Sequence, residues 1–422
     1  MKSSNISPYL SFKNVLLVLI LALIPSFFLH HRINGFITML IIIVGSIHYA
    51  ISFQSIKIKG FILLMPILFL TLVLGQLYST DAKTGWTLIE RSLSLLLIPF
   101  ALSKSNQLTL SNQKLMINVF AITGFLASLY CLAFQGFQAF QSGSIYASEE
   151  STHFLFNRFM HHRLSAPLKM HAVYFSLIIA FLATFIFHKL LYSKSSRSIK
   201  MWLFGLFLFF GVMLVFLKSA IIVIGYSVVI FYMLFRKLSL VTELRQKIIY
   251  IGLAATVFIF SIYAIASKVE FINLNYNMAD LHMGMVAIRL SIWENALSVI
   301  SGNWLLGVGT GDADLELRNA FLDNGFTIGY ENDFNCHNMY LQYWLGNGIL
   351  AIGLFVAYLI LLLKKAVKNQ NKVFIGFVIL FAVFSITEST MRVQKGMVFF
   401  MVISSLFYWN PLLWSNQCTK EQ

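Results

Sequence analysis

The stretch YENDFNCHNMYLQYWLGNGILAIG, from Tyr330 to Gly353, changes from a polar, acidic loop into a long apolar segment at His337. The run from Met339 to Leu363 is long enough to cross a bilayer as a helix, for which roughly 20 apolar residues suffice. His337 and Asn338 are therefore expected where a membrane helix meets water. The largest polar segment of the chain lies directly upstream, so we expect any chemistry at this junction.

The composition of the whole chain is that of an integral membrane protein. Hydrophobic residues make up 58% of the sequence and charged residues only 11%. Apolar stretches of membrane-spanning length recur from end to end, and about twelve can be counted. The expected fold is an all-α polytopic membrane protein with a large, partly helical periplasmic loop. Predicted spans are Asn14–Leu29, Phe36–Phe53, Phe61–Tyr78, Trp86–Leu102, Leu115–Phe137, Leu168–His188, Met201–Leu217, Ser219–Phe235, Ile248–Ser267, Asn338–Leu363, Val373–Thr390 and Met397–Leu413.

The net charge of +15 is explained better by membrane orientation than by a nucleic-acid partner. The basic residues are scattered through short loops between spans and form no stripe interleaved with aromatic residues. Most of them fall on one side if both termini are cytoplasmic, as the positive-inside rule requires. Residues 1–267 are then nine spans, residues 268–336 a periplasmic loop domain, and residues 337–422 three further spans in the inner membrane with a cytoplasmic tail.

The periplasmic segment contains one clear amphipathic pattern, from Met285 to Ile300. Apolar residues including Ile292 and Ala296 recur on one side of the predicted helix, and Ser291 and Asn295 fall on the other. Arg289 lies near the middle of the apolar side, where an unpaired guanidinium would be costly. Either it reaches lipid headgroups, or it points into a cavity that holds an anion such as a phosphate.

Two further residues stand at places where an ionisable group suggests chemistry. Lys218 interrupts an apolar run at an outer turn between two spans, as an interfacial anchor or as a second cation in the same cavity. His337 is either a polar anchor or a base that accepts a proton from a sugar hydroxyl. Asn338 could hold the ring or bind hydroxyls of the substrate, and we expect no metal or cofactor, since no ligand spacing supports one.

Other charged residues near the outer ends of spans are weaker candidates. Arg163 in the outer segment 136–167 and Arg392 are expected to help bind the substrate. The pairs Glu90–Arg91 and Glu388–Arg392 can be structural or functional. The glycine-rich GVGTGD, residues 307–312, is not flanked by a strand and a helix of a nucleotide-binding unit, so a flexible loop is expected.

Several of these residues together resemble the bacterial O-antigen ligase and polymerase superfamily. The resemblance is carried by Arg289 with Trp293, by the glycines of residues 307–311, and by a ligase motif of His337, Asn338 and Gly348. Ala351 stands where this motif ends in Gly, Thr or Val. Leu217–Lys218 replaces the Ser-Arg pair that the family tends to have, so that the charge is kept but the bidentate fork is lost.

The resemblance implies a membrane glycosyltransferase of GT-C type that uses undecaprenyl pyrophosphate as the glycan donor, in contact with membrane lipids. A ligase passes the glycan to a lipid A core sugar, whereas related enzymes pass it to a growing glycan or to a protein hydroxyl. Arg289 and Lys218 would hold the pyrophosphate, and His337 would activate the acceptor in an inverting, metal-independent reaction. Outside the enzymes, a polysaccharide flippase or transporter is the alternative, although it would place more ionisable residues deep within its spans.

Overall fold

The protein is described by a computed structural model that covers residues 12–51, 60–103, 105, 108–147, 157–217, 219–266 and 285–411. Lys218 lies outside these described residues. Within them the elements are helical, apart from an isolated bridge between Tyr146 and Asn157. The helices are α1 (Phe12–Ser26), α2 (His31–Ile51), η3 (Phe61–Leu63), α3 (Leu64–Gln76), α4 (Ala82–Ala101), α5 (Leu110–Ser142), α6 (His161–Ser165), η6 (Ala166–Leu168), α7 (Ala172–Tyr192), α8 (Arg197–Leu217), α9 (Ala220–Leu238), α10 (Leu244–Ala266), α11 (Met285–Asn303), α12 (Ala313–Asp323), α13 (Thr327–Glu331), α14 (Met339–Lys368), α15 (Lys372–Thr387), η8 (Thr390–Arg392) and α16 (Gln394–Trp409).

Each of the predicted spans overlaps one or two of these helices, which confirms the all-helical prediction for the described residues. Among the described residues, six helices are long and apolar enough to cross a bilayer by themselves: α2, α5, α7, α8, α9 and α14. The helices α1 and α15 and the η3–α3 segment are shorter but apolar. The number of twelve crossings therefore stays a prediction, as do the three sequence-based domains.

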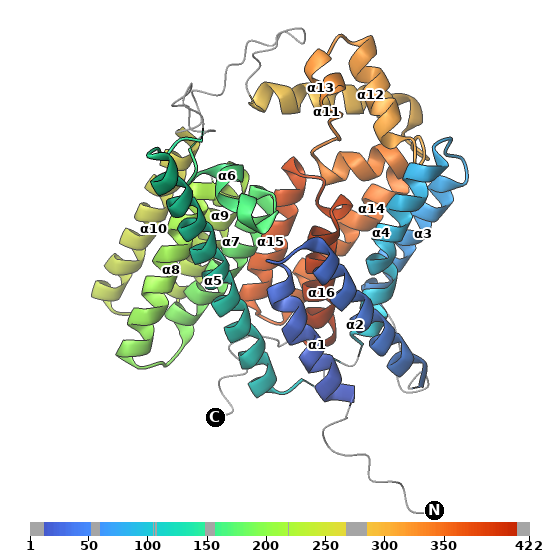
Figure 1. The fold of residues 1–422 in the computed structure, drawn as a ribbon. Coiled ribbons are helices and arrows are strands. Elements are labelled where there is room, and N and C mark those ends of the chain that lie inside the picture. Colours follow the sequence, from blue (N-terminus) through green and yellow to red (C-terminus); the bar gives the residue numbers. More distant parts are fainter. Residues whose placement is uncertain are drawn as a thin grey trace, which may run out of the picture.

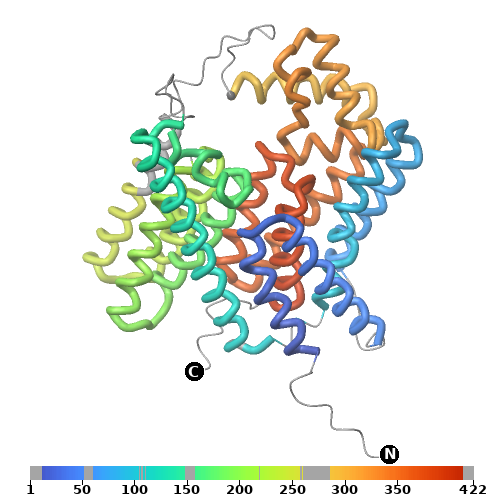
Figure 2. Tube along the Cα trace, viewed as in Figure 1, coloured from blue at the N-terminus to red at the C-terminus, as the bar shows by residue number. Residues whose placement is uncertain are grey.

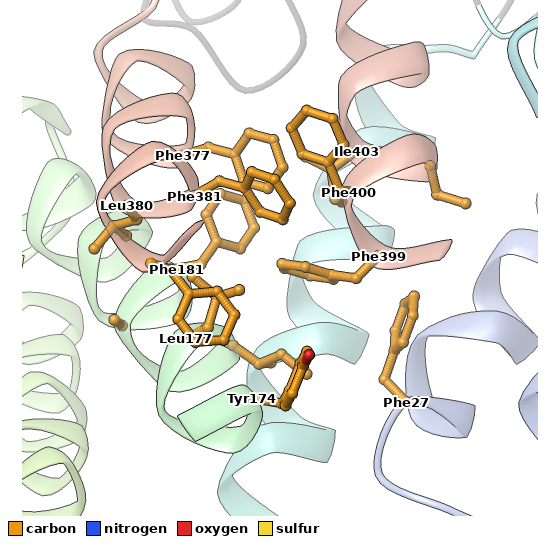
Figure 3. Close-up of a cluster of buried hydrophobic side chains, with 14 of the residues drawn as sticks. Phe27, Tyr174, Leu177, Phe181, Phe377, Leu380, Phe381, Phe399, Phe400 and Ile403 are labelled. Carbon is orange, nitrogen blue, oxygen red and sulfur yellow. The ribbon is translucent and has the colours of Figure 1, made fainter. Parts of the chain in front are cut away.

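Helix α7 lies at the centre of the bundle and is buried around its whole circumference along most of its length. It packs against α8, α9 and α15. Its Phe181 meets Phe377 of α15 edge to face, with ring centroids 5.4 Å apart, and Phe381 of α15 stacks on Phe400 of α16 at 3.9 Å (Figure 3). Interlocked aromatic rings of this kind fix α7, α15 and α16 relative to one another. The segment before α7 and the segment that joins α15 to α16 are thereby held in place.

The helices α11, α12 and α13 form a small unit at one end of the bundle, while α1 begins at the opposite end (Figures 1 and 2). This unit has a hydrophobic cluster of its own, built around Ile292, Leu317, Phe321 and Phe326. The buried face of α11 differs from the predicted one, because Ser291 and Asn295 are buried. The Asn295 amide donates to the Ser291 carbonyl and accepts from Asn324, so its polar atoms are satisfied inside.

The glycine-rich segment 307–312 is a clamped connection, and the expected flexible loop is wrong. Val308 and Gly309 donate backbone hydrogen bonds to the carbonyls of residues 345 and 346 in α14. The Asp312 carboxylate accepts from the backbone amides of Thr80 and Asp81, which precede α4. Gly309 has φ +108, and a Cβ there would lie 2.4 Å from the Ser79 hydroxyl. Left-handed backbone and close approach together require glycine here.

Gly348 interrupts α14 with φ 71 and ψ −170, conformations outside the helical region. A Cβ at this position would lie 2.1 Å from the Leu305 carbonyl oxygen, so only glycine fits. The backbone amide of Ile349, which the break releases, donates to the Trp304 carbonyl. Gly348 thus lets the segment that follows α11 pack into a break in α14.

Candidate functional site

An electropositive cavity of about 490 Å³ opens at the end of the bundle where α7, α14, α15 and α16 meet. Its lining comes from five separate parts of the chain. Among the described residues that line it, four are lysine or arginine, three are histidine and Glu388 is the acid. The polar lining residues are His31, Arg91, Lys169, His171, Asn335, His337, Glu388, Ser389, Arg392, Gln394 and Lys395. An excess of cations around a concave site favours an anionic ligand.

His337 is held at the rim of this cavity by the start of α14. Its φ of +41 places it in the left-handed region, which is uncommon for a residue with a side chain. The next residue, Asn338, is the N-cap, and its side-chain oxygen accepts from the amides of Tyr340 and Leu341. Asparagine is among the best N-cap residues, so the cap fixes where the helix begins. We conclude that Asn338 has a structural role in placing the imidazole.

Glu388 connects the two residues that carried most of the sequence-based prediction. Its Oε1 accepts a hydrogen bond from Nη2 of Arg289 at 3.1 Å, and its Oε2 lies 3.6 Å from Nδ1 of His337. The Glu388 side chain is only 7% exposed, whereas those of Arg289 and His337 are about a third exposed. Nδ1 of His337 is buried and makes no hydrogen bond to any described residue. A small inward movement of the ring would therefore complete a His–Glu hydrogen bond.

Asn335 ties the loop of His337 to the loop of Glu388. Its side-chain oxygen accepts both from the backbone amide of His337 at 2.9 Å and from the hydroxyl of Ser389 at 3.0 Å. Burial lowers the pKa of the Arg289 guanidinium, and the Glu388 charge partly opposes that shift. An arginine stays protonated at neutral pH even so. The structure thus brings Arg289 and His337 together, on opposite oxygens of one carboxylate.

Arg392 lines the cavity, but its guanidinium is already occupied. Both terminal nitrogens pair with the two carboxylate oxygens of Asp314 in α12, and the side chain is 17% exposed. Burial lowers the pKa of Arg392, but the hydrogen bonds and charge of Asp314 outweigh burial, and the net shift is upward. This bidentate pair joins η8 to the α11–α13 unit. Arg392 thus lines the cavity with a guanidinium whose charge is already paired.

Three other cations line the cavity. The sequence left the role of Arg91 open and did not single out Lys169 or Lys395. Arg91 of α4 and Lys169, which follows η6, make no side-chain hydrogen bond or ion pair within the part of the chain that the structure describes. The Lys395 ammonium donates to the Leu29 carbonyl between α1 and α2. Arg91 and Lys169 are exposed, so each can turn toward a bound anion.

His171 adds an uncharged imidazole to the same wall. It is the N-cap of α7, where its ring accepts from the backbone amide of Val173. Burial, reinforced by the neighbouring His162, lowers the pKa of His171 to about 4, although Glu388 opposes the shift. His171 is therefore neutral at physiological pH. The net positive charge of the cavity comes from its lysines and arginines.

The remaining predicted residues have different outcomes. Arg163 lies on α6, outside the residues that line the cavity, and its backbone carbonyl accepts from Gln135. Lys218 falls outside the described residues. Glu388, left open by the sequence, proves to be the centre of the cluster. One sequence signal could have identified Glu388. It is an isolated acidic residue between two apolar spans, and the outer ends of these spans lie near the start of α14.

Residues 206–356 match the model of a protein family described as O-antigen ligase. This span includes Arg289, His337 and the Gly348 break, and it ends before Glu388. No curated protein matches the sequence. The match confirms the resemblance predicted from the sequence. The similarity to this family is thus carried by residues 206–356, about a third of the chain.

Proposed function

We propose that this protein transfers a glycan from undecaprenyl pyrophosphate to an acceptor hydroxyl, and that the acceptor is a sugar of the lipid A core. The observation that carries the proposal is the cationic cavity, with His337 and Glu388 in its wall and Arg289, which does not itself line the cavity, bound to Glu388. A pyrophosphate leaving group brings negative charge that lysines and arginines stabilise. An acceptor hydroxyl needs a base close to that anion, and the imidazole of His337 is placed there.

The Glu388 carboxylate orients the imidazole of His337 and sets its tautomer. With Nδ1–H directed toward Oε2 of Glu388, the other ring nitrogen, Nε2, is left with a lone pair. That lone pair accepts the proton of the acceptor hydroxyl, and Glu388 stabilises the resulting imidazolium. A buried carboxylate is suited to this task because its charge is little screened by water.

The transfer step itself is a single displacement at the anomeric carbon. The acceptor oxygen forms a bond to C1 of the sugar while the C1–O bond to the pyrophosphate breaks. The electron pair of that bond remains on the lipid pyrophosphate, which leaves on the opposite face, so the configuration is inverted. Arg289, through the part of its fork not bound to Glu388, together with Arg91 and Lys169, neutralises the growing charge, and we assign the same role to Lys218.

The orientation that this reaction requires places the cavity on the periplasmic face and both termini in the cytoplasm. A cysteine in place of Asp323, an exposed residue at the end of α12, should react with a membrane-impermeant maleimide in intact spheroplasts. Ser196→Cys, in the exposed turn before α8, should react only after permeabilisation. Both variants need Cys418 replaced by serine, since Cys131 and Cys336 are buried. The opposite labelling pattern would place the cavity in the cytoplasm and contradict the proposal.

The activity can be measured with purified protein in nanodiscs. We expect transfer of a glycan from undecaprenyl pyrophosphate to lipid A core in excess EDTA, with undecaprenyl pyrophosphate as the second product, because cations of the protein grip the leaving group. Turnover with a glycan end or a peptide hydroxyl as the better acceptor would identify a polymerase or a protein ligase instead. A requirement for added Mg²⁺ would show that the acids of the loop hold the pyrophosphate through a metal.

A further inference from the structure

We propose that an apolar groove between α1, α5 and η6 seats the first isoprenoid units of the donor lipid, an inference that rests on the proposed function. The groove has a volume of about 550 Å³. Its walls are Phe28 and Leu29 after α1, Leu126 and Tyr130 of α5, and Leu168 of η6. α5 packs against both α1 and η6, so the three elements form one surface.

The groove and the cationic cavity meet at Lys169, which lines both. Two further connections join them: Lys395 of the cavity donates to the carbonyl of Leu29 in the groove, and His30 of the groove precedes His31 of the cavity. A molecule lying in the groove would thus place its polar end against the cations. This is the layout of a polyprenyl pyrophosphate, whose hydrocarbon begins directly at the phosphate.

The backbone around Lys169 is built to hold the cation at that boundary. Ala166–Leu168 form a short 3-10 turn that contains Pro167, and the Lys169 amide closes it on the carbonyl of Ala166. Lys169 itself has φ 49 and ψ 41, a left-handed backbone conformation that residues other than Gly and Asn rarely adopt. A lysine held in this way presents its ammonium at the mouth of the groove at a cost in backbone energy.

We place the other end of the groove against the bilayer, because its wall includes an exposed residue of a candidate membrane span. Leu126 is 56% exposed on α5, a helix long and apolar enough to cross the membrane. A polyprenyl chain can therefore run from the groove into surrounding lipid without leaving an apolar environment. Since lipid tails are as apolar as the groove, burial gives little affinity. The groove acts by orienting the sugar C1 toward His337, which is a rate effect.

The effect on rate is tested by filling the groove and comparing two donors. Ala127, a buried small residue of the groove floor, is changed to phenylalanine, and the matched control is Leu129→Phe, on the same helix but outside the groove. We expect Ala127→Phe to lower kcat/KM roughly 10-fold or more for the undecaprenyl donor, yet to leave a donor with a two-isoprene chain almost unchanged. Transfer from the short donor shows that the variant is folded. Lys169→Asn, which keeps the left-handed backbone, should weaken both donors alike.

Two kinetic results would overturn the inference. One is equal behaviour of Ala127→Phe and Leu129→Phe toward the long donor. The other is an Ala127→Phe variant in which only the KM for the acceptor rises. That result would mean that the groove binds the acyl chains of lipid A.

A second readout does not depend on turnover. A photoreactive benzoylphenylalanine at residue 126 should crosslink to radiolabelled undecaprenyl pyrophosphate, and one at residue 129 should not. Crosslinking at residue 126 without any glycan transfer would support the groove as a lipid-binding site and contradict the proposed function. Glycan transfer without crosslinking at residue 126 would support the proposed function and contradict the groove as the site of the donor lipid.

Discussion

His337→Asn should abolish glycan transfer while leaving the binding of the lipid-linked donor nearly intact. Asparagine tolerates the left-handed backbone at this position, so the variant removes the base without adding strain. Loss of a general base costs roughly 10²- to 10⁴-fold in rate. Donor affinity should change little because the pyrophosphate is held by the lysines and arginines. The measurement is single-turnover transfer together with binding of undecaprenyl pyrophosphate to the same preparation.

The matched control for this variant is His161→Asn. His161 is also a histidine with positive φ, at +50, and it does not line the cavity. It should transfer glycan at close to the wild-type rate. Glu388→Gln should resemble His337→Asn, because an amide can donate to Nδ1 and so favour the wrong tautomer. Loss of donor binding in His337→Asn with normal chemistry in Glu388→Gln would refute the assigned roles.

Arg289→Lys should lower the transfer rate roughly 10- to 100-fold, as expected for one charge-assisted hydrogen bond worth about 1.5–3 kcal/mol. Lysine keeps the charge but cannot bind Glu388 and a phosphate oxygen together, as a planar guanidinium fork can. The affinity for the donor should therefore fall along with the rate. Both quantities are obtained from transfer measured over a range of donor concentrations.

Arg318→Lys is the control for the loss of a guanidinium in the same unit. Arg318 of α12 pairs with Asp333 at 3.0 Å, and both side chains are well exposed. Exposed pairs contribute little to stability, so this variant should behave as the wild type. Normal transfer and normal donor binding in Arg289→Lys would mean that Arg289 only anchors α11 to the bundle.

The helices and the place of the site could be predicted from local sequence. Spans were visible because apolar runs of sufficient length have few alternatives to a membrane helix. The position of His337 was visible because the polar loop changes there into an apolar run of membrane-spanning length. The N-cap role of Asn338 was not predicted. Arg289 was visible because a cation on a largely apolar helix needs a partner.

The partners themselves could not be predicted, because they are distant in sequence. Glu388 lies 99 residues from Arg289 along the chain, and nothing local indicates that the two meet. The clamped segment 307–312 depends on contacts with the start of α4 and with α14, which no local pattern records. The burial of Asn295 was missed for a similar reason, since Asn324 satisfies its side chain from another helix.

The central claim, that this cavity joins a lipid-linked glycan to the lipid A core, is tested most directly in a deletion strain examined by lipopolysaccharide gel. The wild-type gene should restore long-chain lipopolysaccharide, and His337→Asn should instead leave the glycan on undecaprenyl pyrophosphate. Lipid A carrying a single glycan unit, or loss of glycans from proteins only, would identify a different acceptor. Long-chain lipopolysaccharide that persists unchanged in the deletion strain would contradict the account.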